Sequence, residues 1–272
     1  MRLSGKIALV TGAAGGIGLA VAEAFAARGD TVSGVDARGP ELQAAMTELA
    51  RRGTTTHALV ADLADARCAE VVEQATRLAG PVDVLVNAAG IYPATRLDAM
   101  TAGMWDRVQQ VNVRAPVLLT VALARAGRPA SVVNISSGAA TRARPGAAHY
   151  CTSKAALEMA TKACAVELAE RGIRVNAVAP GFVEVDSPVN PVTDEYAAAV
   201  SVNPTGRPGR PDEIAAAVVW LAGADAAFVT GAVLRVDGGA TAGTAALPVH
   251  HPGTTALQNA ALQNAAPPNA GG

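Results

Sequence analysis

The sequence predicts an α/β fold, in which one domain holds a doubly wound parallel sheet with helices on both faces. Strand-like apolar runs and helix-like segments alternate about seven times along the chain, which indicates about seven strands. Such alternation needs crossover connections, and crossovers make successive strands parallel and cover the sheet with helices. The first apolar run also leads into a glycine-rich turn, which is typical of the first strand-to-helix connection in such folds.

Each predicted strand is a short apolar run, and each predicted helix repeats apolar residues at helical spacing. The predicted strands cover residues 7–10, 31–35, 57–60, 82–86, 131–135, 173–179 and 232–236. The predicted helices cover residues 17–28, 41–51, 104–126, 149–171 and 212–221, and a further helix ends at residue 78. Asp65 is expected to cap that further helix, and Asp212 and Glu213 to open the last one, because acidic side chains favour helix N-termini.

Two segments depart from this alternation. Residues 180–211 are rich in proline, and a long loop of this kind inside a compact domain is usually functional. We expect this loop to shape a substrate pocket and to become ordered when ligands bind. Residues 241–272 contain no Asp, Glu, Lys or Arg and repeat the pentapeptide Ala-Leu-Gln-Asn-Ala. This composition indicates a low-complexity tail that follows a domain of residues 1–240.

Composition excludes several classes of function. The net charge of −1 offers no electrostatic surface for nucleic acid or for an anionic membrane. The longest apolar runs, such as residues 214–224, are too short to span a bilayer. The glycine-rich N-terminal stretch fits mature structure better than a secretory signal.

The cysteines and histidines predict neither a disulfide framework nor a metal site. The chain has three scattered cysteines, which are interpreted as the reduced thiols of a cytoplasmic protein. His250 and His251 are adjacent in the polar tail, and such a pair alone does not indicate a metal ligand set. No metal is therefore expected.

The glycine-rich turn predicts a dinucleotide site. Gly12 permits the tight turn, Gly16 allows a pyrophosphate to approach the backbone, and Gly18 allows the helix to pack on the strand. Ile17 lies in the first turn of that helix, whose N-terminus faces the phosphates. The alternative is a purely structural turn, but the position between the first strand and the first helix favours cofactor binding.

Asp36, at the end of the second predicted strand, points to NAD rather than NADP. A carboxylate there accepts hydrogen bonds from the adenosine ribose hydroxyls and repels a 2′-phosphate. Arg38 is the nearest positive charge and the one signal in favour of NADP; its alternative role is that of a solvated surface arginine.

Tyr150 and Lys154 indicate acid–base chemistry. They are four residues apart on a predicted helix and therefore lie on one face of it. A nearby ammonium favours the phenolate and lowers the pKa of a tyrosine towards working pH. Ser137, at the end of a predicted strand, is placed to hydrogen-bond a substrate carbonyl. An exposed polar pair is the alternative that spacing alone leaves open.

Together these residues resemble the short-chain dehydrogenase/reductase family over about residues 3–240, in the order and spacing of its motifs. The resemblance rests on the glycine turn, Asn87-Ala88-Ala89-Gly90, Asn112, Asn134-Ile135-Ser136-Ser137, Tyr150-Cys-Thr-Ser-Lys154 and Pro180-Gly181. It implies a single Rossmann-type domain that binds NAD(P) and carries catalysis within residues 1–240.

The resemblance also implies roles for individual residues. Tyr150 is the expected acid and base, Ser137 orients the substrate, Lys154 holds the nicotinamide ribose, and Asn112 supports a water next to Lys154. The remaining expected cofactor contacts flank the adenine, the underside of the cofactor and the nicotinamide. In that order they are Asp62 with Leu63, then Asn87, Ala88 and Gly90, then Pro180, Gly181 and Val183.

One position departs from the family pattern. Many members have a threonine four residues after the glycine of Pro-Gly, where it binds the carboxamide, whereas this chain has Val185. Ser187 is the nearest hydroxyl. The departure concerns carboxamide binding and leaves the hydride chemistry untouched.

The sequence thus predicts an oxidoreductase that transfers hydride between NAD(H) and a secondary alcohol or ketone. The resemblance implies a homo-oligomer, most often a tetramer, formed through helices near residues 104–126 and 149–171. The alternatives are an NADP-preferring ketoreductase, a non-catalytic NAD sensor and a structural protein on the same fold. Arg142 and Arg144 lie between Ser137 and Tyr150 and are interpreted as surface arginines, with contact to a substrate carboxylate as the alternative.

Overall fold

The predicted architecture is confirmed. The computed structural model describes residues 5–185, 193, 195, 197, 199 and 202–243. Within them lies a sheet of seven strands in the order β3-β2-β1-β4-β5-β6-β7, and every neighbouring pair is parallel. The strands are β1 (Ile7–Thr11), β2 (Thr31–Asp36), β3 (Thr56–Val60), β4 (Val84–Asn87), β5 (Ala130–Ile135), β6 (Ile173–Pro180) and β7 (Val233–Val236).

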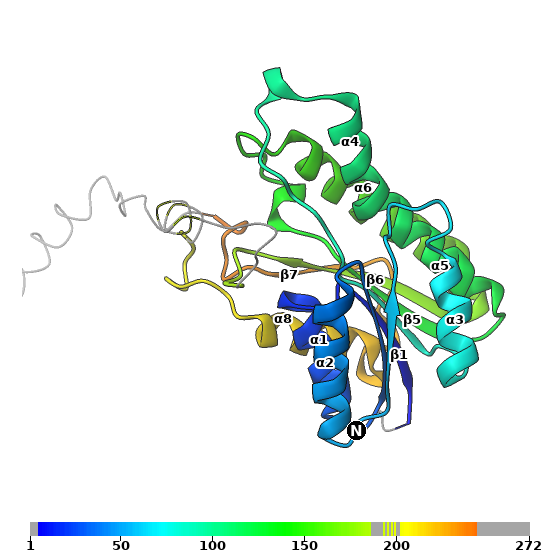
Figure 1. Ribbon diagram of the computed structural model, residues 1–272. Helices are drawn as coiled ribbons and strands as arrows, with labels where there is room; N and C mark the ends of the chain where they lie inside the picture. The colour runs from blue at the N-terminus through cyan, green and yellow to red at the C-terminus, as the bar shows by residue number, and fades with distance from the viewer. Residues whose placement is uncertain are drawn as a thin grey trace, which may run out of the picture.

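Helices cover both faces of the sheet (Figure 1). One face carries α1 (Gly16–Ala26), α2 (Gly39–Arg51) and α8 (Pro211–Ala222). The other face carries α3 (Glu70–Ala79), α5 (Ala115–Arg125) and α6 (Ala148–Leu168), with α4 (Ala102–Gln109) beyond them. The short elements are η1 (Leu97–Ala99), η2 (Gln110–Arg114), η3 (Gly138–Ala140), η4 (Ala169–Arg171) and η5 (Ala224–Ala226).

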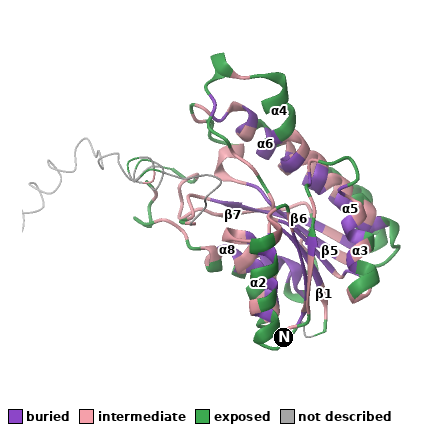
Figure 2. Ribbon diagram, in the orientation of Figure 1, coloured by how far each residue is buried: buried purple, intermediate pink, exposed green. Residues whose placement is uncertain are grey.

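The core is divided between the two faces of the sheet. In β1, Ala8 and Val10 pack with α1, α2 and α8, whereas Leu9 packs with α3, α5 and α6. This alternation follows from the two-residue period of a strand, and both sets are buried because both faces are covered. Figure 2 shows the central strands buried and the outer sides of α2 and α4 exposed.

Two predicted helices begin or continue differently. Asp65 does not cap α3, which begins at Glu70; its carboxylate instead accepts a hydrogen bond from the Arg67 amide, 2.7 Å away. An aspartate that bonds the amide two residues on favours a turn over a helix start. The predicted helix 104–126 is divided by η2, a π-helical turn, immediately before Pro116. Proline has no N–H for the carbonyl four residues earlier, so the regular ladder cannot pass through this point.

Several predictions lie outside the described residues. They concern Ser187, Pro188 and Pro191 in the 180–211 loop, and residues 244–272, which include His250 and His251. The two ends of that loop are described, and they meet where Val183 pairs with Gly209. None of the described helices combines the length and the apolar character needed to cross a bilayer.

The sheet order places a crevice where ligands bind in this architecture. The chain leaves β1 towards β2 on one side and reaches β4 on the other, so the order reverses between β1 and β4. In open α/β sheets, ligands bind at the carboxyl ends of the strands at such a switch point. The fold therefore points to the ends of β1 and β4.

Candidate active site

The predicted site residues gather at one edge of the sheet. Asp36, Asn87 and Pro180 are the last residues of β2, β4 and β6, and Ser137 follows β5 by two residues. Because all these strands are parallel, their carboxyl ends meet at the same edge. Segments far apart in the sequence are thereby brought together at the switch point.

Two glycines of the turn between β1 and α1, Gly12 and Gly18, leave no room for a side chain. A Cβ on Gly12 would lie 2.9 Å from the Cα of Ala89, and the φ of Gly12 is +73°. A Cβ on Gly18 would lie 2.1 Å from the carbonyl oxygen of Gly12, so α1 packs directly on the turn. The contact with Ala89 shows that the absence of a side chain at Gly12 also allows the Asn87–Gly90 segment to approach the turn. The sequence alone does not indicate this second role.

The start of α1 fits a dinucleotide phosphate. Its N-cap residue, Gly15, has no side chain that could accept from the first amides of the helix. The N–H groups of Gly16, Ile17 and Gly18 therefore have no partner within the helix and lie at its positive end. An uncapped helix N-terminus behind a glycine turn suits the pyrophosphate of NAD(P).

Thr11 fastens the Asn87–Gly90 segment to β1. Its Oγ1 accepts hydrogen bonds from the amides of Ala88 and Ala89, each at 3.1 Å, and donates to the carbonyl of Val86 at 3.4 Å. The predicted floor of the cofactor site is thus held by a buried hydroxyl of β1. The sequence analysis did not single out Thr11 for this role.

Asn87 extends this floor towards α6. Its Nδ2 donates to Oδ1 of Asn134 at 2.8 Å, and Nδ2 of Asn134 donates to the Thr161 hydroxyl at 2.9 Å. The Oδ1 of Asn87 is buried and has no hydrogen-bond partner among the described residues. An unsatisfied buried acceptor at the switch point is consistent with a site that a cofactor completes.

Asp36 is engaged from two sides. Its Oδ2 accepts from the amide of Ala14 at 3.1 Å, and its Oδ1 accepts from the amide of Arg38 at 3.0 Å. The Arg38 side chain forms a salt bridge with the same carboxylate at 3.2 Å. Nη2 of Arg38 also lies 3.5 Å from where a Cβ on Gly15 would be, so the guanidinium sits beside the glycine turn. Arg38 is therefore part of the site rather than a solvated surface arginine.

Asp62 and Leu63 follow β3, and their side chains lie in different surroundings. Leu63 is buried in the core, whereas the Asp62 carboxylate forms a salt bridge with Arg107 of α4 at 3.0 Å. Burial raises the pKa of Asp62, but the Ala64 amide and the Arg107 guanidinium outweigh burial and hold the pKa below its usual range. An ionised carboxylate is thus available at the predicted adenine end.

Asn112 lies inside the π-helical turn and is fully buried. Its Oδ1 accepts from the amide of Ile91, and its Nδ2 donates to the carbonyl of Ile91, both at 2.9 Å. Nδ2 also donates to the Ser153 hydroxyl at 3.0 Å, and that hydroxyl donates to the carbonyl of Tyr150. Asn112 therefore ties the segment after Gly90 to the helix that carries Tyr150.

Lys154 is almost completely buried beside Gly90. Its Nζ donates to the carbonyl of Ile135 at 2.7 Å and lies 3.5 Å from where a Cβ on Gly90 would be. Burial lowers the pKa of Lys154 to about 8. A lysine of this kind changes its charge close to physiological pH.

Tyr150 and Ser137 meet across the gap between α6 and β5. Their side chains are hydrogen-bonded, and Oγ of Ser137 also accepts from the amide of Ala139 at 3.1 Å. Burial raises the pKa of Tyr150, while the hydrogen bond with Ser137 and the charge of Arg144 act against that rise. This differs from the expected lowering by Lys154, because burial prevails and Lys154 donates to the Ile135 carbonyl instead.

Pro180, Gly181 and Val183 continue the site along β6. The Gly181 amide donates to the carbonyl of Val236 at 3.0 Å, and a Cβ on Gly181 would lie 2.9 Å from the Cα of Asp237. Val185 lies over the glycine turn, with Cγ1 3.6 Å from where a Cβ on Gly16 would be. The segment after Gly181 thus returns to the phosphate turn and encloses the space between them.

Two side chains beside Tyr150 were not predicted as site residues. The ring of Tyr92 lies 5.6 Å from the Tyr150 ring, centroid to centroid, and the Arg144 guanidinium lies 5.6 Å above the Tyr150 ring. No spacing rule indicated Tyr92, because it reaches Tyr150 from another segment of the chain. The sequence predicts Arg144 as a surface arginine, with contact to a substrate carboxylate as the alternative, and the fold places it over the ring of Tyr150.

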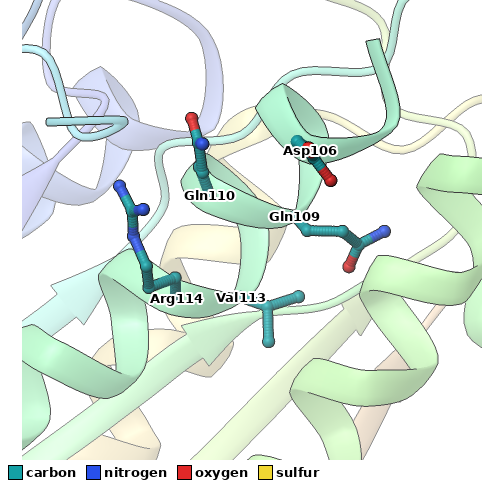
Figure 3. Close-up of a pocket in the computed structure, with 5 residues that line it drawn as sticks. All are labelled: Asp106, Gln109, Gln110, Val113 and Arg114. Atoms are coloured by element: carbon teal, nitrogen blue, oxygen red, sulfur yellow. The ribbon is translucent and has the colours of Figure 1, made fainter. Parts of the chain in front are cut away.

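A separate surface cavity of about 270 Å³ lies along α4 and η2 (Figure 3). Its lining residues are Asp106, Gln109, Gln110, Val113 and Arg114. It contains none of the predicted site residues. Gln109 links it to the helix of Tyr150, because its side-chain amide donates to the carbonyl of His149 at 3.1 Å.

Comparison with known proteins places the chain among dehydrogenases and reductases. A family model described as enoyl-(acyl carrier protein) reductase matches residues 12–241. A 3-oxoacyl-[acyl-carrier-protein] reductase of Thermotoga maritima is 40% identical over 245 residues, covering 88% of this chain and 99% of that protein. A galactitol 2-dehydrogenase of Agrobacterium fabrum is 37% identical over 257 residues, covering 88% and 98%.

Solved structures show the same similarity. A short chain dehydrogenase from Burkholderia cenocepacia in complex with NADP superposes with a TM-score of 0.84 at 36% identity, covering 89% of this chain and 100% of that one. A blue fluorescent protein from a metagenomic library, in complex with NADPH, gives a TM-score of 0.82 at 39% identity, covering 88% and 99%. The fold and the sequence thus agree on one group of relatives.

Proposed function

The chain belongs to the short-chain dehydrogenase/reductase family, and we propose that it interconverts a secondary alcohol and a ketone with Tyr150 as acid and base. As a member of the family it is an NAD(P)-dependent oxidoreductase that acts on CH–OH groups. The observation that carries the proposal is the hydrogen bond between Ser137 and Tyr150, beside the buried ammonium of Lys154.

The proposed mechanism assigns one proton to Tyr150. In oxidation its phenolate removes the proton of the substrate hydroxyl, and in reduction its phenol returns that proton to the carbonyl oxygen. Ser137 holds the same oxygen through its hydroxyl in both directions. A bound nicotinamide supplies or accepts the hydride.

Lys154 and Asn112 support this proton transfer. The Lys154 ammonium lies 5.7 Å from the Tyr150 ring centroid and is proposed to hold the nicotinamide ribose. Asn112 holds the α6 segment through Ser153 and is proposed to support a water beside Lys154. With a pKa of about 8, Lys154 is the group in this chain that passes a proton towards that water.

We propose that NAD(H) is the preferred cofactor because Asp36 ends β2 beside the glycine turn. An adenosine 2′-phosphate would meet this carboxylate at close range. NADP(H) is the second candidate, since the Arg38 guanidinium lies beside Gly15 and two solved relatives contain NADP or NADPH. For Arg38 to bind a 2′-phosphate, it would first have to leave Asp36.

The substrate is proposed only as a class. The named relatives act on 3-oxoacyl groups carried by a protein and on the polyol galactitol, so both a β-ketoacyl thioester and a polyol are substrates to test. We further propose a homotetramer in the cytoplasm, with a catalytic domain of residues 1–240 and a separate tail of residues 241–272. The three free cysteines suit a reducing compartment.

Turnover tests the proposal. The purified protein is assayed with NADH and with NADPH against β-ketoacyl thioesters and ketoses, and with NAD⁺ and NADP⁺ against polyols. We expect turnover of at least one substrate, with kcat/KM higher for the NAD(H) pair. Tight NADH binding without turnover across this panel would instead favour a cofactor sensor, and absence of cofactor binding would favour a structural protein.

A further inference from the structure

Two cations from different parts of the fold lie near the ring of Tyr150. Arg144 is on the segment between η3 and α6, and its Cζ lies 5.6 Å from the centroid of the Tyr150 ring. Lys154 is on α6, one turn after Tyr150, and its Nζ lies 5.7 Å from the same centroid. Both distances are within the range in which a cation interacts with an aromatic face.

The two cations differ in how they hold their charge. Lys154 is buried, donates to the Ile135 carbonyl, and has a pKa lowered to about 8. A guanidinium remains charged at every pH at which a protein is folded, and the half-buried Arg144 is close enough to solvent to stay hydrated. As the pH rises through 8, Lys154 therefore loses its charge, whereas a guanidinium does not titrate in this range.

Among the described residues, the other groups around Tyr150 do not supply a positive charge. Ser137 hydrogen-bonds the phenol from the end of β5, Tyr92 faces it from the segment after β4, and Cys151 follows it on α6. An ionised Tyr92 or Cys151 would oppose formation of a second negative charge on Tyr150. Burial and these two groups raise the pKa of Tyr150, and the charge of Arg144 lowers it.

We propose that Arg144 is a positioning residue that acts through Tyr150, as a second cation that stabilises its phenolate. The inference rests on the proposed role of Tyr150 as acid and base. The loop after η3 returns over the Tyr150 ring and places Arg144 there. Helical spacing from Tyr150 does not predict a cation at this position. The consequence is that the phenolate keeps a positive neighbour even at alkaline pH, where Lys154 is neutral.

Titration of Tyr150 tests the proposal without any turnover. The chain has three tyrosines, so Tyr92→Phe with Tyr196→Phe leaves Tyr150 as the one phenol whose ionisation ultraviolet absorption can follow. In this background we expect Arg144→Gln and Arg144→Met each to raise the pKa of Tyr150 by about one unit. Arg144→Lys keeps the charge and is expected to retain most of the effect.

Arg142→Gln is the matched control. It removes the same charge from the same loop, two residues away, where the side chain bonds the carbonyl of Ala240 instead of facing Tyr150. We expect this control to leave the pKa of Tyr150 unchanged. The same pKa with and without Arg144, or an equal rise in Arg142→Gln, would overturn the proposal.

The pH profile of alcohol oxidation gives the second measurement. We expect the acid limb of log kcat/KM to move to higher pH by the same amount in Arg144→Gln, while Arg144→Lys follows the unsubstituted enzyme. A lower rate with an unmoved limb would mean a merely structural role and would overturn the proposal. A wild-type protein without turnover would contradict the proposed function alone, because the titration of Tyr150 stands independently.

Discussion

The Nε atom of Arg38 lies 3.2 Å from Oδ1 of Asp36, so the carboxylate at the predicted ribose site is paired with the cation beside it. Both side chains are partly shielded, and the same carboxylate also accepts the amides of Ala14 and Arg38. A ribose that binds here would share Asp36 with Arg38. A 2′-phosphate would instead compete with Asp36 for Arg38. Under the proposed function, the choice between NAD and NADP would therefore depend on this pair.

Replacement of Asp36 by alanine is expected to erode the preference for NAD. It removes a charged acceptor for the ribose, worth about 1.5–3 kcal/mol, and leaves Arg38 available to a 2′-phosphate. The kcat/KM ratio of NAD over NADP should fall about tenfold or more. Arg38→Gln is the mirror variant and should raise the ratio. If the wild type already prefers NADP, the interpretation of Asp36 is wrong and Arg38 dominates.

Tyr150→Phe is expected to remove turnover while NADH binding stays nearly unchanged. The phenol is the proposed proton carrier, and such groups contribute about 10²–10⁴-fold to rate. The control is Tyr92→Phe, which keeps the ring 5.6 Å from Tyr150 and loses only its own hydroxyl. Steady-state kcat and fluorescence titration with NADH measure the two effects. Retention of more than about a tenth of wild-type kcat in Tyr150→Phe would remove Tyr150 from the mechanism.

Thr11→Val should destabilise the protein by about 1–3 kcal/mol, because the partly buried amides of Ala88 and Ala89 lose their acceptor. Thr11→Ser restores the hydroxyl and should recover most of the loss. Urea unfolding measures the free energy, and NADH affinity should fall in parallel because the Asn87–Gly90 segment forms the floor of the site. Equal stability of the valine and serine variants would contradict the role given to Thr11.

His149 makes stability depend on pH. It is fully buried, and burial lowers its pKa; the carbonyl of Pro93 opposes that shift without reversing it. The unfolded chain protonates this imidazole near pH 6.5 and the folded chain only at lower pH. Below about pH 6.5 the unfolded state therefore binds more protons, and stability falls as the pH drops.

Two variants that cannot titrate, His149→Phe and His149→Gln, should both flatten this decline. The free energy of unfolding is measured from pH 7 down to about pH 5, the range in which the unfolded imidazole gains its proton. Either substitution lowers stability at neutral pH through lost packing. The relevant result is therefore the slope of the unfolding free energy against pH and not its value at one pH. A slope as steep as that of the wild type in both variants would mean that another group causes the decline.

Deletion of residues 245–272 is expected to leave folding and hydride transfer unchanged. The segment has no Asp, Glu, Lys or Arg, and its composition offers too few large apolar side chains to offset about 1–2 kcal/mol per ordered residue. The cut spares Asp237, whose carboxylate accepts the amides of Gly239 and Thr241. Melting temperature, oligomer mass and kcat/KM should match the full chain. A truncated protein that dissociates or loses activity would assign the tail to the assembly.

The sequence by itself determined the fold and predicted the main residues of the candidate site. Strand and helix periods are local properties, and the glycine turn, Asp36 and the Tyr150–Lys154 spacing all follow from short stretches of chain. The parallel order of the sheet then places the ends of these stretches at one edge, so Ser137 and Tyr150 meet as expected.

Only the tertiary structure decided the electrostatics and the supports of the site. The position of Asp65 in the sequence fits both a helix cap and a turn. The structure shows the turn, in which the Asp65 carboxylate accepts a hydrogen bond from the Arg67 amide. The pKa of Tyr150 depends on burial and on Arg144, and Thr11 supports Ala88 only because β1 and β4 are neighbours. Burial, charge and hydrogen bonding are sums over groups that are close in space, and distance along the chain does not fix them.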